Sequence, residues 1–77
     1  MNPPTGNPVN RKKLPNSKWT AVRPVNREKH FIVLDWVRDD DGNPTDHLVI
    51  EAVLTKRERE IHWRDLEAAD SWRVGWR

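Results

Sequence analysis

Hydrophobic and polar residues alternate along five short stretches of this chain, as they do in β-strands that bury one face. Valine, isoleucine and tryptophan, which favour strands, are concentrated in these stretches. The segments between them contain residues typical of turns, above all the Asp-Gly and Asn-Pro pairs within residues 39–46. We therefore predict strands at residues 18–22, 29–38, 47–54, 58–63 and 72–77.

The second predicted strand has apolar residues on both faces. Ile32, Leu34 and Trp36 alternate on one face, while Val33 and Asp35 between them belong to the opposite face. A strand that is apolar on both sides is typical of a central or strongly curved position in a sheet. We expect this strand to be central or strongly curved.

The last predicted strand alternates large apolar residues with arginine and glycine. Trp72, Val74 and Trp76 would share one face, and Arg73 and Arg77 the other. The glycine between Val74 and Trp76 permits a bend in the strand.

The hairpin between residues 47–54 and 58–63 can be built in two registers. A two-residue turn would place Glu51 opposite Glu60, and like charges directly opposite each other are unfavourable. A four-residue turn over residues 55–58 would place Glu51 opposite His62 and also keeps the apolar faces together. We prefer the four-residue turn.

Five short strands predict a small, mainly β fold. Residues 64–70 have the character of a short helical turn before the last strand. We predict an SH3-like five-stranded barrel over residues 18–77, with an open antiparallel sheet carrying one short helix as the alternative. Residues 1–17, which contain four prolines, are predicted to be a flexible basic arm.

Composition narrows the class of protein. The chain has 77 residues, of which 35% are hydrophobic, so it forms one domain at most. Its five tryptophans are the main candidates for the core, Trp36 and Trp63 above all. Because there is no cysteine and no long apolar run, we expect no disulfide and no membrane span. We expect a cytoplasmic monomer.

Charge is divided unevenly along the chain. Residues 1–30 hold seven basic side chains and one acidic side chain, whereas residues 31–77 are mildly acidic. A basic segment with aromatic residues suits RNA, since cations contact phosphates and indoles stack on bases. We therefore expect contact with RNA or a ribonucleoprotein; the alternative is a protein partner bound by a tryptophan patch or an acidic strand face. The candidate nucleic-acid-binding residues are Arg11, Lys12, Lys13, Lys18, Trp19, Arg73, Trp76 and Arg77.

No pattern in the sequence indicates catalysis or metal binding. There is no cysteine nucleophile, and the three glycines do not form a phosphate-binding loop. The acidic residues of 39–46 lack the spacing of a calcium-binding loop. The nearest approach to an acid–imidazole site is a patch of His62 with Glu60 and Glu51. We expect no enzymatic activity, no cofactor and no metal.

A wider pattern extends over about residues 10–77. It consists of the stretches KKLPNSKWTAV, EKHFIV, EAVLTKR and WRDLEAADSWRVGW. This pattern resembles a family of small tryptophan-rich proteins of unknown function from proteobacteria and cyanobacteria. The resemblance implies a bacterial cytosolic protein, and it implies no activity.

Overall fold

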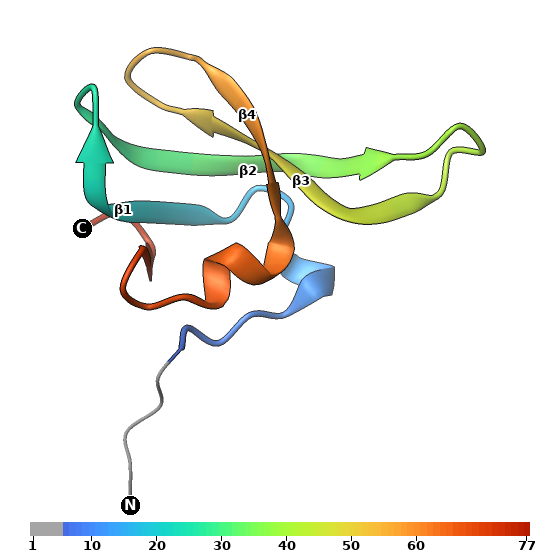
Figure 1. Cartoon of the computed structure of the whole chain (residues 1–77), viewed down its shortest axis with the longest axis horizontal. Coiled ribbons are helices and arrows are strands. Elements are labelled where there is room, and N and C mark those ends of the chain that lie inside the picture. Colours follow the sequence, from blue (N-terminus) through green and yellow to red (C-terminus); the bar gives the residue numbers. More distant parts are fainter. Residues whose placement is uncertain (1–5) are drawn as a thin grey trace, which may run out of the picture.

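A computed structural model describes residues 6–77 and contains one antiparallel sheet of five strands (Figure 1). Two short 3-10 helices accompany the sheet: η1 (Arg11–Lys13) comes before it, and η2 (Trp63–Glu67) lies between its last two strands. Among these residues, no helix is long and apolar enough to cross a membrane. The strands are β1 (Lys18–Val25), β2 (Glu28–Arg38), β3 (Pro44–Ala52), β4 (Glu58–His62) and β5 (Trp72–Val74).

The strand order is β4-β3-β2-β1-β5, so that β4 and β5 form the two edges of the sheet. Within residues 6–77 these edges are not paired with each other, and the sheet is not closed into a barrel. The predicted closed barrel is therefore wrong in this respect, and the predicted open antiparallel sheet is correct. One physical reason is the length of β5, which has only three residues because the chain bends at Gly75 (φ 80°).

A β-bulge changes the face on which the second half of β2 packs. Val33 pairs with Ile50, but Asp35 pairs with Val49, so Leu34 is an extra residue in the ladder. Strict alternation predicted that Trp36 shares a face with Leu34. After the bulge, Trp36 instead packs against the same core as Val33.

The register of β3 and β4 differs from both registers that the sequence suggested. The amide of Ala52 donates a hydrogen bond to the carbonyl of Arg57 at 2.9 Å, which encloses a four-residue loop at residues 53–56. Glu51 then lies opposite Glu58. The loop has the predicted length but begins two residues earlier, and a shift of two residues leaves each side chain on its expected face.

Thr55 explains why the loop takes this position. Its hydroxyl group accepts a hydrogen bond from the amide of Arg57 at 3.2 Å and donates one to the carboxylate of Glu28 on β2. Lys56 completes the loop with a positive φ of 65°. These local interactions outweigh the repulsion between two carboxylates that are partly in contact with water.

The core lies between one face of the sheet, η2 and the amino-terminal segment. Trp19, Trp63 and Trp72 are buried there, and Trp36 is half-buried against it. The rest of the buried apolar cluster is Leu14, Phe31, Val33, Leu48, Ile50, Ala52 and Leu66.

Part of the segment that we predicted as a flexible arm contributes to this core. The side chain of Leu14 is 2% exposed. The side-chain amide of Asn7 donates hydrogen bonds to the carbonyls of Leu66 at 2.8 Å and Trp72 at 2.7 Å. Residues 1–5 of the predicted arm lie outside the described residues, and residues 6–17 run along η2 and beneath the sheet (Figure 1).

Candidate nucleic-acid interface

Trp19 is not available to stack on a base. Its side chain is 3% exposed, and its indole N–H donates a hydrogen bond to the Ser17 hydroxyl at 2.9 Å. The prediction of an exposed Trp19 is therefore wrong. Its position on β1, paired with Phe31, directs the indole into the core.

Trp76 is exposed, as a stacking residue must be. Its side chain is 44% exposed, and its indole N–H donates to the carbonyl of Phe31 at 3.0 Å. The Nζ atom of Lys18 lies 4.8 Å from the indole ring centroid, within the range of a cation–π interaction. The ring of His30 lies 6.0 Å from the same indole. One hydrogen bond thus holds an exposed aromatic ring beside a lysine.

The backbone after Gly75 is anchored to the sheet. The Thr20 hydroxyl donates to the carbonyl of Gly75 at 2.6 Å and accepts from the amide of Arg77 at 2.9 Å. His30 Nε2 lies 3.0 Å from the carbonyl oxygen of Arg77. These contacts bring together Lys18, His30, Trp76 and Arg77, which we call the tail cluster.

Arg73 lies beside this region, in the lining of a surface hollow. A cavity of about 480 Å³ is lined by Arg73, Arg77, Asn7 and Pro8, together with Val74 and Ala69. Arg77 also donates from Nε to the carbonyl of Val74 at 3.1 Å. Arg77 therefore connects the tail cluster with Arg73.

The other three predicted cations lie on η1, in a separate group. The Cζ atom of Arg11 lies 5.1 Å from the ring centroid of Trp36 and 5.0 Å from that of Trp63. Arg11 also forms an exposed ion pair with Asp46 at 3.3 Å. The guanidinium group of Arg11 thus already has partners within the protein and is less free to bind a phosphate. Lys12 and Lys13 are exposed.

A groove beside η1 contains an aromatic residue that we had assigned only to the core. A hollow of about 360 Å³ is lined by Arg11, Lys12, Trp36 and Pro44. Trp36 is half-buried, so part of its indole borders this groove. The bulge in β2 places it there, and the sequence pattern carried no signal for that bulge. We call Lys12, Lys13 and Trp36 the η1 cluster.

The histidines are arranged differently from the predicted acid–imidazole patch. His62 lies edge-on to His47, with ring centroids 5.3 Å apart, and its Nδ1 accepts from the amide of Arg64 at 3.1 Å. Glu60 lies 4.0 Å from His47 rather than beside His62. His62 therefore caps the start of η2. Over residues 6–77 no three His, Cys, Asp or Glu side chains are grouped in a way that could hold a metal ion.

Comparison with known families agrees with the resemblance seen in the sequence. Residues 17–77 match the family described as tryptophan-rich protein (DUF2389). The chain belongs to this family. Comparison with curated proteins and comparison with solved structures each gave no match.

The tryptophans of this DUF2389 protein fall into three classes. Trp19, Trp63 and Trp72 build the core, and Trp36 is half-buried at the η1 groove. Trp76 is the most exposed of the five. The tryptophan content of this chain therefore serves mainly the core, and two indoles are left with surface for a ligand.

Proposed function

We propose that this chain is a non-enzymatic, monomeric binding module of the bacterial cytoplasm that contacts RNA or a ribonucleoprotein. The tail cluster is the observation that carries the proposal. An exposed indole held by a backbone hydrogen bond is a rigid surface for a base, and Lys18 and Arg77 beside it supply charge for phosphates. A single strand fits this arrangement better than a duplex, because its bases are free to stack.

The η1 cluster is a second point of contact in this proposal. Lys12 and Lys13 are exposed on a short 3-10 helix, and Trp36 borders the groove beside it. Each lysine is assigned to a phosphate, and Trp36 to the edge of a base or sugar. Trp19, which we first assigned to stacking, has no part in it.

The test is a titration of the protein with a fluorescent single-stranded RNA at several salt concentrations. With about four phosphates neutralised, log K should fall with log salt with a slope near −3. Trp76→Ala should cost about 1–3 kcal/mol of binding free energy, the usual value of one base–aromatic stack. Lys13→Gln should make the slope shallower by about 0.7.

The matched control is Lys56→Gln, which removes the same charge from the exposed β3–β4 loop. This variant should bind RNA with nearly the slope of the parent protein. An affinity that does not depend on salt, or equal losses in Lys13→Gln and Lys56→Gln, contradicts the proposed interface.

A protein partner is the second candidate, and the acidic face of β3 and β4 favours it. Glu51 and Glu58 lie directly opposite each other, and Glu60 follows on the same face of β4. A basic partner surface would relieve this repulsion on binding. In a pull-down, binding that survives nuclease treatment and is lost in Glu51→Gln/Glu58→Gln would support this second function over RNA binding.

We also propose that the fold is SH3-like in a partly open form. The support lies in the order of its elements, because β5 pairs with β1 and a 3-10 turn precedes β5. The bulge at Leu34 and the register shift in β1 between Thr20 and Val25 add the curvature that such folds require.

A further inference from the structure

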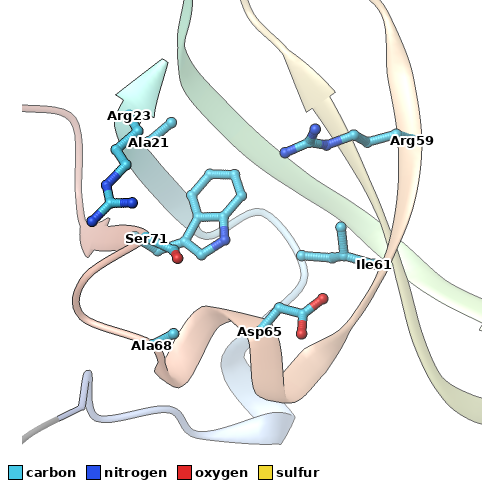
Figure 2. Close-up of a pocket in the computed structure, with 8 residues that line it drawn as sticks. Ala21, Arg23, Arg59, Ile61, Asp65, Ala68 and Ser71 are labelled. Atoms are coloured by element: carbon cyan, nitrogen blue, oxygen red, sulfur yellow. The ribbon is translucent and has the colours of Figure 1, made fainter. Parts of the chain in front are cut away.

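A pocket lies where the sheet does not close, and we call it the seam pocket. It has a volume of about 350 Å³ and lies between β1 and the turn before β5 on one side and β4 with η2 on the other (Figure 2). Neither the tail cluster nor the η1 cluster contributes a residue to it. Its lining is Ala21, Arg23, Arg59, Ile61, Asp65, Ala68, Ser71 and Trp72.

Two arginines stand on opposite walls of the seam pocket. Figure 2 shows the Arg59 side chain extending from β4 across the opening, with Arg23 on the far wall. Neither arginine forms an ion pair with any of residues 6–77. Two unpaired guanidinium groups around one hollow favour an anionic ligand, since arginine binds carboxylates and phosphates through paired N–H donors.

Arg59 is held in place by the core beneath it. Its Cζ atom lies 5.4 Å from the ring centroid of Phe31 and 5.9 Å from that of Trp72. A guanidinium group held over two aromatic rings loses little conformational freedom when it binds an anion. Arg59 is therefore arranged in advance for a ligand in the pocket.

The pocket does not suit a nucleotide. Trp72 is only 5% exposed, and its ring packs against Phe31 at 5.2 Å and beneath Arg59, so it offers no open face to a base. Asp65 forms part of the wall, and its carboxylate would repel a terminal phosphate, with about two charges, more strongly than a carboxylate, with one. A single carboxylate can pair with arginine, and an N–H donor beside it would satisfy Asp65.

We propose that the seam pocket binds an acidic segment of a protein partner. One glutamate or aspartate of that segment pairs with Arg59 and Arg23, and a small apolar neighbour packs against Ile61. A backbone N–H of the bound segment donates to Asp65. The volume, at the lower end for ligand pockets, accommodates two or three residues of the partner.

The probe for this proposal is the peptide acetyl-Ala-Glu-Ala-amide, with acetyl-Ala-Gln-Ala-amide as its neutral counterpart. In NMR titrations of the full chain, the glutamate peptide should shift the Nε–H signals of Arg59 and Arg23 and the amide of Ser71. The glutamine peptide should bind about tenfold more weakly, because it lacks the charge that strengthens the hydrogen bonds. Inorganic phosphate should not cause a saturable shift of these signals.

Two variants connect the binding to the arginines. Arg23→Gln should weaken the glutamate peptide about tenfold, and it should leave folding intact because Arg23 is exposed. Arg59→Lys keeps the charge over the rings but loses the paired donors, so it should also weaken binding. Lys13→Gln, which lowers RNA affinity in the function proposed above, should leave peptide binding unchanged.

Three outcomes overturn the proposal. They are equal binding of the glutamate and glutamine peptides, unchanged binding in Arg23→Gln, and displacement of the glutamate peptide by single-stranded RNA. The last result would show that the seam pocket contacts nucleic acid instead. Failure of RNA to bind anywhere would overturn only the tail and η1 clusters, since the two proposals share no residue.

Discussion

The Thr20 hydroxyl donates a hydrogen bond to the backbone carbonyl of Gly75, with the two oxygens 2.6 Å apart. Thr20 is 3% exposed and is the one buried polar residue among residues 6–77. The same hydroxyl accepts from the amide of Arg77 at 2.9 Å. A single side chain thus satisfies two backbone groups beyond β5 and fixes the segment that carries Trp76.

Thr20→Val should release this segment. Valine preserves the shape of threonine but leaves the two backbone groups without their partner, at a cost of about 1–3 kcal/mol in the free energy of unfolding. Urea denaturation measures the loss, and acrylamide quenching of tryptophan fluorescence should show that Trp76 has become more accessible.

The matched control is Thr45→Val. Thr45 also makes two hydrogen bonds, donating to the carbonyl of Val37 at 2.8 Å and accepting from the amide of His47 at 3.2 Å. It belongs to the β2–β3 hairpin, so its replacement should lower stability without changing the quenching. Equal quenching in both variants would show that Thr20 does not anchor the tail.

Arg27→Gly should stabilise the protein. Asn26 and Arg27 form the turn between β1 and β2 with positive φ angles of 56° and 64°. Two-residue turns of this kind favour Asn-Gly, because arginine in a left-handed conformation carries a steric cost of about 1–2 kcal/mol. The gain should be about 0.5–1 kcal/mol, since glycine also increases the freedom of the unfolded chain. Arg27→Ala, which retains the Cβ atom, should show little of this gain in urea denaturation.

Leu14→Ala should destabilise the fold, although Leu14 lies in a proline-rich segment. It is 2% exposed within the core cluster, and truncation of such a residue costs about 2–5 kcal/mol. Leu54→Ala provides the comparison, because Leu54 is 68% exposed and should change stability by less than about 0.5 kcal/mol. Similar midpoints for the two variants in thermal unfolding would mean that residues 6–17 do not belong to the domain.

The sequence predicted all five strands because alternation follows directly from the geometry of a strand, but the last one ends at Val74 and not at residue 77. Phe31, Val33 and Ile50 are buried as an amphipathic sheet requires. Alternation could not reveal the bulge at Leu34, since one inserted residue changes the face without changing the composition. Composition predicted Trp36 as a core residue, but the face of β2 on which it packs was beyond the sequence pattern.

The candidate site was harder to predict than the fold. Lys18, Trp76 and Arg77 come together, although alternation placed Trp76 and Arg77 on opposite faces of a strand, and Arg11 is occupied by two indoles and Asp46. Trp19 follows a basic segment in the sequence, but this position does not determine whether its side chain is buried. Burial depends on the face of β1 that a residue occupies, and Trp19 faces the core. The seam pocket escaped prediction because its arginines are 36 positions apart in the sequence. They share one hollow only because β1 and β4 curve toward each other.

Replacing Glu58 should show the cost of the unexpected β3–β4 register. Glu58 lies directly opposite Glu51, and such like-charged pairs are destabilising by about 0.2–1 kcal/mol. Glu58→Thr removes the repulsion and should raise the free energy of unfolding by about that amount in low salt, with a smaller gain at high salt because of screening. Glu60→Thr is the matched control, because Glu60 lies opposite Val49 and close to His47 and has no carboxylate directly opposite it. If instead Glu60→Thr gives the salt-dependent gain and Glu58→Thr does not, the register in solution places Glu51 opposite Glu60, as the two-residue turn would have done.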